Sequence, residues 1–179
     1  MLLYHGTNAN FDKFSLDFIG TGAKCNSEGV GIYFSDSKDL ARTYAFNNGR
    51  VFTIKWNGNK AISSKEVTLS REEVRKFLVE LHKRTNVLEN FNDISYYGYE
   101  AVLEETVDIL LDNDNDIDIV GELSNTCGSD VDTLDVLYNI LGYDHAVVEA
   151  TWGYDLGQKN IYIAFTPDII EVLDVENCQ

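Results

Sequence analysis

The chain has 179 residues, of which 44% are hydrophobic, and no Pro/Gly/Ser-rich linker divides it, so we expect one domain over residues 1–179. Its formal net charge of −16 argues against unaided binding to nucleic acid, because that affinity comes from Lys and Arg neutralising phosphates. No stretch approaches the roughly 20 apolar residues of a membrane span, so no membrane partner is expected.

The first third of the chain alternates between strand and helix patterns. Runs of β-branched and aromatic residues predict strands, and a helix over about Lys38–Phe46 is expected between the second and third of them. Asp36 is the predicted N-cap of that helix. The predicted strands are Leu2–His5, Val30–Ser35 and Val51–Trp56.

Polar and aromatic residues on these elements form a candidate binding site. Gly6 lets a flat ligand approach the backbone beside the His5 imidazole, because glycine has no Cβ, and Thr7 adds a hydroxyl. Tyr33 and Tyr44 would offer two ring faces to one aromatic ligand. Taken singly, His5 would be interpreted as a histidine whose hydrogen bonds are satisfied within the fold, and Tyr33 as an ordinary strand residue. The spacing of the whole set of residues instead favours a binding site.

From Ser70 onward the apolar residues follow a helical period. Ser70 and Glu73 form a capping-box pattern at the start of a helix that ends near Arg84. Residues 66–141 are therefore expected to form a mainly helical insertion. Its other predicted helices are about Gly98–Leu111 and Val131–Leu141.

Charge is distributed unevenly along the chain. Residues 1–85 carry 13 Lys/Arg and 9 Asp/Glu, whereas residues 86–158 carry no Lys or Arg and 17 Asp/Glu. A solvated acidic surface is the first interpretation of this segment, because acidic runs usually serve solubility. Docking of a basic partner on 86–158 is the second, and imitation of nucleic-acid charge is the third.

The segment Asp112–Asp118 alternates oxygen-bearing side chains, which would suit calcium. An EF-hand loop needs glycine at its sixth position and glutamate at its twelfth, and these positions hold Ile117 and Leu123. We therefore predict a solvated acidic loop and no metal site.

The C-terminal part returns to strand patterns, so the expected fold class is α+β. Asp144 and His145 read as a capped strand start, and the segment 166–168 with the only proline reads as a turn. The predicted strands are Ala146–Ala150, Asn160–Phe165 and Ile169–Val175.

The segments Tyr4–Thr7 and Gly29–Ser35, followed by Tyr44 eleven residues after Tyr33, resemble the NAD-binding half of ADP-ribosyltransferases of the poly(ADP-ribose) polymerase and diphtheria-toxin type. The resemblance covers residues 1–56 and resumes from Leu141, where the ending is similar to forms in phage and mobile-element proteins. It implies an ADP-ribosyltransferase-like split β-sheet core that carries the acidic helical insertion.

The resemblance also implies roles for individual residues. In such a pocket His5 holds a ribose hydroxyl, Gly6 and Thr7 lie against the nicotinamide amide, and two tyrosines sandwich the nicotinamide ring. The tyrosines are Tyr33 and Tyr44 here, and the small-residue position facing the ring, often serine in relatives, is Ala41.

The third catalytic position departs from the glutamate pattern. Alignment on the segment Tyr162–Phe165 places Ile161 where the class has glutamate, which in the family stabilises the cation-like ribose. Several members with isoleucine or leucine there transfer a single ADP-ribose, so Ile161 argues against chain elongation and not against transfer. With a shifted strand register Gln158 or Asn160 could still hydrogen-bond the ribose, whereas Glu149 on the preceding strand is interpreted first as an exposed strand residue.

The resulting hypothesis is a mono-ADP-ribosyltransferase with NAD as its substrate and a macromolecular acceptor, protein before nucleic acid. The alternatives are an inactive module that binds NAD or ADP-ribose, and an acidic interaction module that inhibits a nucleic-acid-binding protein. A cytoplasmic location, in the producing or host cell, is expected because no signal-peptide pattern begins the chain and its cysteines lack paired spacing. The cysteines are Cys25, Cys127 and Cys178.

Overall fold

The computed structural model describes residues 1–19, 29–46, 48–150 and 159–178, with the backbone alone at 149 and 150. Its seven strands form one hydrogen-bonded series in the order β4-β5-β6-β2-β1-β3-β7, and only β4 and β5 are parallel neighbours. The strands are β1 (Leu2–Thr7), β2 (Ile32–Ser35), β3 (Arg50–Trp56), β4 (Ala61–Ile62), β5 (His145–Ala150), β6 (Lys159–Ala164) and β7 (Ile170–Asn177).

The sheet is nearly divided between β1 and β2. The two strands are in register at the single pair Tyr4↔Ser35, whereas β1 pairs with β3 along its whole length from Leu2 to Thr7. The sheet thus consists of two halves, β4-β5-β6-β2 and β1-β3-β7, which agrees with the expected split core.

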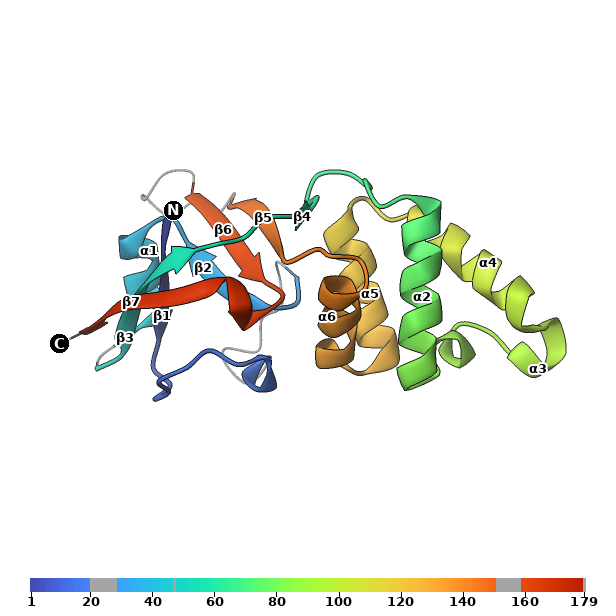
Figure 1. The fold of residues 1–179 in the computed structure, drawn as a ribbon, viewed down its shortest axis with the longest axis horizontal. Coiled ribbons are helices and arrows are strands. Elements are labelled where there is room, and N and C mark those ends of the chain that lie inside the picture. Colours follow the sequence, from blue (N-terminus) through green and yellow to red (C-terminus); the bar gives the residue numbers. More distant parts are fainter. Residues whose placement is uncertain (20–28, 47, 151–158, 179) are drawn as a thin grey trace.

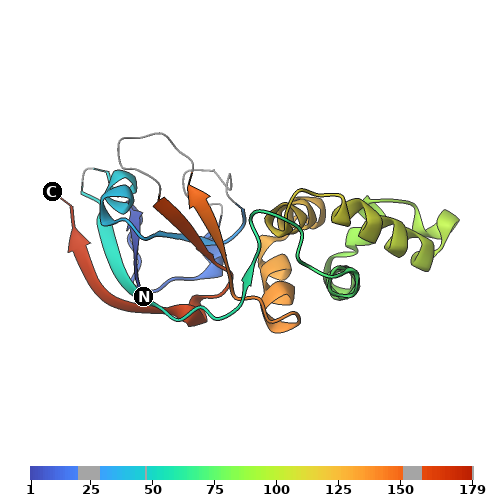
Figure 2. The same ribbon diagram turned by 90° about the horizontal axis from the view of Figure 1, so that it is seen from above.

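Within the described residues six α-helices accompany the sheet, which confirms the α+β class. One of them packs on β1, and the other five lie together at the opposite end of the elongated molecule (Figures 1 and 2). The helices are α1 (Lys38–Tyr44), α2 (Arg71–Thr85), α3 (Ile94–Tyr97), α4 (Tyr99–Leu111), α5 (Asp116–Cys127) and α6 (Asp130–Asn139), and the 3-10 turns are η1 (Leu16–Phe18), η2 (Val87–Asn90) and η3 (Pro167–Ile169).

A shared hydrophobic core attaches the helices α2–α6 to the sheet. Buried side chains of α2, α4, α5 and α6 form one cluster with Ala146 of β5 and Ile163 of β6. A second cluster lies around Phe34 and Phe52, next to β1. Burial of apolar area stabilises the folded state by about 25 cal/mol per Å². The first cluster therefore holds the helices against β5 and β6.

Helix α1 starts one residue later than its predicted cap. The N-cap is Ser37, whose Oγ accepts a hydrogen bond from Leu40 N at 3.3 Å. The carboxylate of Asp36 instead accepts a hydrogen bond from Asn160 N at 3.3 Å, which joins β2 to β6. The prediction of Asp36 as N-cap was wrong because a neighbouring strand offered its carboxylate a different donor.

The prediction of a solvated loop over Asp112–Asp118 was also wrong in its second half. Asp116 is fully buried, and α5 begins there. Its carboxylate accepts hydrogen bonds from the backbone N–H groups of Ser63 (2.9 Å), Thr68 (2.8 Å) and Leu69 (3.0 Å), and from the Thr68 hydroxyl (2.5 Å). The burial of this carboxylate is possible because four donors replace water.

Part of the acidic segment pairs with α2. This helix carries arginines along its length, and α4 and α6 place carboxylates beside them. Such exposed pairs contribute little each, about 0–1 kcal/mol, but they leave fewer carboxylates for an external partner. The pairs are Arg71 with Glu104 and Asp108, Arg75 with Glu100 and Glu104, and Arg84 with Asp132 and Asp135.

Three further observations concern only the described residues. No helix there is long and apolar enough to cross a membrane. No group of three or more His, Cys, Asp or Glu side chains there is arranged to hold a metal ion. Cys127 and Cys178 are free thiols, and Cys25 lies outside the described residues.

Candidate active site

His5 bridges the two halves of the sheet. It lies on β1, and its Nδ1 is 2.7 Å from the carbonyl oxygen of Tyr33 on β2. Because a carbonyl only accepts, Nδ1 carries the proton and donates it. Nε2 has no hydrogen-bond partner among the described residues, and His5 is half-buried, so this nitrogen is left for a ligand.

The ring of His5 is surrounded by phenylalanines. The His5 centroid lies 5.1 Å from that of Phe14, 5.5 Å from that of Phe34, and 6.2 Å from those of Phe11 and Phe52. Burial among these rings lowers the pKa of His5, and the hydrogen bond to the Tyr33 carbonyl opposes this only in part. His5 is therefore neutral near pH 7, and Nε2 is a hydrogen-bond acceptor.

Gly6 is required by the close packing of β1 on α1. A Cβ at this position would lie 1.7 Å from the carbonyl oxygen of Ala41, far inside van der Waals contact. The side chain of Ala41 is buried, with 2% of its surface exposed, against Val51 and Tyr4. The predicted neighbours Gly6 and Ala41 thus lie together, with the Ala41 carbonyl against the glycine.

Thr7 and Tyr44 lie at the ends of their elements. The hydroxyl of Thr7, the last residue of β1, accepts a hydrogen bond from Ala9 N at 3.0 Å. Tyr44 ends α1 with 56% of its surface exposed, and its ring stacks on no ring among the described residues. Its ring therefore has room for a flat ligand on its surface.

Tyr33 and Ile161 occupy the face of the sheet that carries the helical insertion. Phe34 contacts His5, and side chains alternate along a strand, so Tyr33 points to the opposite face from the His5 ring. The Tyr33 hydroxyl donates to the Gly29 carbonyl. Ile161 on β6 pairs with Ser35 of β2, and it packs with Tyr33 against the helical core cluster.

No carboxylate replaces the glutamate at position 161 within the described residues of β6. Asn160 is half-buried, and its backbone N–H is bonded to Asp36. Glu149 pairs with Asn160 across β5 and β6, and its side chain is not described. Gln158 lies outside the described residues.

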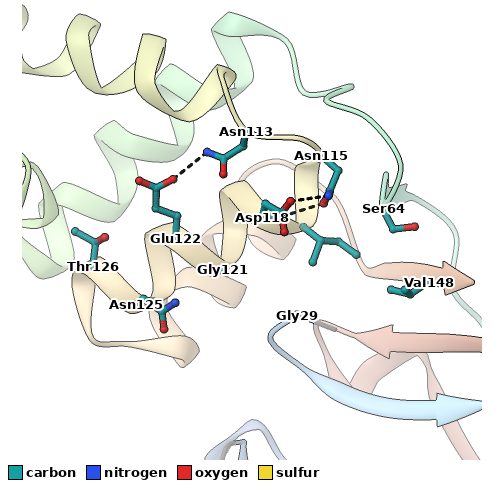
Figure 3. Close-up of a pocket in the computed structure, with 11 residues that line it drawn as sticks. Gly29, Ser64, Asn113, Asn115, Asp118, Gly121, Glu122, Asn125, Thr126 and Val148 are labelled. Carbon is teal, nitrogen blue, oxygen red and sulfur yellow. Dashed lines mark hydrogen bonds between the residues drawn. The ribbon is translucent and has the colours of Figure 1, made fainter. Parts of the chain in front are cut away.

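A polar cleft opens beside this face, between α5 and the sheet (Figure 3). It has a volume of about 610 Å³, and Gly29 and Val148 form its wall on the sheet side. Sequence reasoning did not find this cleft, because the segment 112–118 was interpreted as a loop. The helix lines it with Asn115, Ile117, Asp118, Gly121, Glu122, Asn125 and Thr126, and Ser64 and Asn113 complete the lining.

Asp144 and His145 have structural partners. Asp144 accepts hydrogen bonds from the backbone N–H groups of Asn59 (2.9 Å) and Lys60 (3.2 Å), and it contacts the ring of His145. His145 packs edge-on against Trp56. Both residues thus hold the start of β5, as the interpretation as a capped strand start predicted.

The chain is similar to a known protein family. A family model described as ADP-ribosyltransferase in polyvalent proteins matches residues 1–178. Comparison with curated proteins and with solved structures gives no match.

Proposed function

Because the chain belongs to the family of ADP-ribosyltransferases in polyvalent proteins, we propose that it is a mono-ADP-ribosyltransferase that uses NAD and modifies a protein. The reaction breaks the bond between C1′ of the ribose and the nicotinamide nitrogen, and the electron pair of that bond leaves with nicotinamide. An acceptor atom forms the new bond to C1′ and releases its proton to solvent.

The observation that carries this proposal is the geometry of His5. Its Nδ1 proton is held by the Tyr33 carbonyl at 2.7 Å, and burial keeps the ring neutral. Nε2 is therefore a fixed acceptor, which suits the hydroxyl of a ribose. Fixing the ring before substrate arrives reduces the entropy lost when the ribose is oriented.

Gly6 and Tyr44 support the same site, one packed against α1 and the other at the end of that helix. Gly6 keeps the β1 backbone free of a Cβ beside His5, and Tyr44 presents an exposed ring at the end of the helix. A nicotinamide ring would bind between the Gly6 backbone and aromatic faces of Tyr33 and Tyr44. In this proposal Thr7 lies at the edge of the pocket, and the buried Ala41 supports it from behind Gly6.

Transfer of a single ADP-ribose follows from Ile161. An apolar side chain neither stabilises a cation-like ribose nor activates a hydroxyl of bound ADP-ribose for further addition. Rate acceleration would then come from orientation of NAD and from the acceptor itself. Chain elongation is therefore not expected.

The test is nicotinamide release from labelled NAD, with label followed onto protein and nucleic acid in a cell lysate. The variants His5→Gln and Tyr33→Ala should each reduce transfer by about 100-fold or more, because the first removes a contact that orients the ribose and the second one that orients the nicotinamide ring. His82→Gln is the matched control, since His82 lies on α2 and packs on Tyr99, away from the sheet.

Each outcome of that assay has a definite meaning. Loss of transfer in His5→Gln with full activity in His82→Gln supports the site. Full activity in both His5→Gln and Tyr33→Ala would place the chemistry elsewhere. Polymeric label on the product would contradict the role given to Ile161.

A binding module without transfer is the second candidate, and the packing of Ile161 favours it. The side chain is held in the apolar cluster where a catalytic carboxylate is otherwise needed. NAD binding in a calorimeter without any nicotinamide release would support this candidate. Nicotinamide release that depends on His5 would exclude it.

A further inference from the structure

The cleft beside α5 borders the candidate active site at two points. Gly29, on its wall, accepts the hydrogen bond of the Tyr33 hydroxyl. Val148, also on its wall, is the cross-strand partner of Ile161. The wall of the cleft therefore consists in part of direct neighbours of Tyr33, which is assigned to the nicotinamide ring, and of Ile161, which is assigned to the ribose.

Close packing holds α5 in this position. A Cβ on Gly29 would lie 2.7 Å from Cγ2 of Ile117, so the first turn of α5 rests directly on this glycine. The buried carboxylate of Asp116 ties the same turn to the segment 63–69. The helical wall of the cleft is thus fixed relative to the sheet.

The side chains of this wall are polar and negatively charged. Asn115, Asp118, Glu122 and Asn125 follow one another at intervals of three or four residues, so they share one face of α5 (Figure 3). Asp118 accepts a hydrogen bond from the Asn115 amide at 2.6 Å, and Glu122 accepts one from the Asn113 amide at 2.9 Å. Each carboxylate keeps further lone pairs for a ligand.

No cation within the described residues neutralises these two carboxylates. The ion pairs of the acidic segment involve α4 and α6, whereas Asp118 and Glu122 have amide partners only. The surrounding segment 86–158 contains no Lys or Arg. The cleft therefore attracts a cationic group and repels phosphates.

We propose that this cleft is the acceptor subsite and that it receives the side chain of an arginine in a protein substrate. This inference rests on the proposed function. A guanidinium presents five N–H donors in a planar fork, which matches two carboxylates with amide oxygens beside them. Its apolar stem would lie along Val148 and Ile117. The new bond would join a guanidinium nitrogen to C1′, with loss of one proton to solvent.

The test is direct binding of labelled peptides by fluorescence anisotropy, in the absence of NAD. The probes are a Gly-Arg repeat, the same repeat with neutral citrulline, and a Gly-Lys repeat. The variant Asp118→Asn/Glu122→Gln should bind the arginine peptide about tenfold more weakly than the wild type, because two charge-assisted contacts are lost. The citrulline peptide should bind weakly to every form.

The control variant is Asp112→Asn/Asp114→Asn, which removes the same charge from exposed residues outside the cleft lining. Equal weakening in both variants would overturn the inference, since the attraction would then come from net charge. Equal binding of arginine and citrulline peptides would overturn it too. Tighter binding of the lysine peptide would overturn the assignment to arginine.

The nicotinamide-release assay separates this inference from the proposed function. Release that depends on His5, without cleft-dependent peptide binding, overturns only the acceptor subsite. Cleft-dependent binding of the arginine peptide without any release overturns the transferase, and with it the acceptor role, and leaves the cleft as an arginine-binding site.

Discussion

Replacement of Asp116 tests whether one buried carboxylate fixes the position of α5. Asp116→Ala removes the acceptor of three backbone N–H groups and one hydroxyl in the segment 63–69. The side chain is fully buried, so its loss also leaves a small cavity. We expect a large loss of stability without a change of secondary structure.

The magnitude follows from the burial of the donors. The Leu69 N–H is in the core, and an unsatisfied buried donor costs about 1–3 kcal/mol. The donors of Ser63 and Thr68 are partly open to water, so each contributes about 0.5 kcal/mol. The sum is about 3 kcal/mol, out of a stability of about 5–15 kcal/mol for a domain. Asp116→Asn keeps one acceptor oxygen and should cost about half as much.

Urea unfolding followed by circular dichroism measures these changes. Asp114→Ala is the control, because Asp114 is exposed and its loss should change the free energy of unfolding by less than about 0.5 kcal/mol. The expected order of destabilisation is Asp116→Ala, then Asp116→Asn, then Asp114→Ala. A loss below about 1 kcal/mol in Asp116→Ala would refute the assignment of Asp116 as the residue that fixes α5.

Three further predictions concern other parts of the fold. Gly6→Ala should unfold the protein or lower its melting temperature sharply, because the new Cβ would lie 1.7 Å from the Ala41 carbonyl oxygen. Gly121→Ala has open space at its Cβ and should be neutral or stabilising. Thermal melts of both variants test this difference. Burial lowers the pKa of His5 in the folded state below its ordinary value of 6.5, so the unfolded chain binds this proton first and stability should fall as pH drops below 6.5. The slope of unfolding free energy against pH should be smaller in His5→Gln, and an unchanged slope would contradict a buried neutral ring. Ser70→Ala removes the capping box of α2 and should cost about 1 kcal/mol in urea unfolding, while no loss would mean that water replaces the cap.

Local sequence patterns were sufficient for the elements that carry their own periodicity. The capping box of Ser70 and Glu73 lies at the start of α2 as predicted, and Val74, Phe77, Leu78 and Leu81 are its buried residues. Strand patterns also placed β1, β2 and β3 to within one or two residues at most ends. These segments were predictable because propensity, capping and apolar spacing all favour the same structure.

Helix α5 was not predicted because its first turn consists of Asp and Ile residues after a run of Asp and Asn. The run suggests a loop, yet Asn115 caps the helix by accepting a hydrogen bond from Asp118 N at 3.1 Å. The apolar spacing of Ile119, Val120 and Leu123 was the available indication of a helix. What the sequence did not reveal was the burial of Asp116, because its donors come from a segment about 50 residues away.

The candidate site also has one part that the sequence predicts and one part that it does not. The residues around His5 were predicted from short motifs, whereas the phenylalanines that lower its pKa were not, since Phe11 and Phe14 lie in a loop without a pattern. The cleft depends on the meeting of α5 with β5, which are distant in sequence. Such tertiary contacts have no local pattern from which to infer them.

The parallel pair of β4 with β5 has a consequence for how the chain folds. Ala61 pairs with His145, more than 80 residues later, and the whole helical insertion lies between them. Closing so long a loop has an entropic cost, but helices that have already packed on one another bring their two ends together beforehand. We therefore expect this edge of the sheet to assemble late, at a rate governed by the helices, so that mutations that weaken the packing of α2–α6 on one another also slow the completion of the sheet.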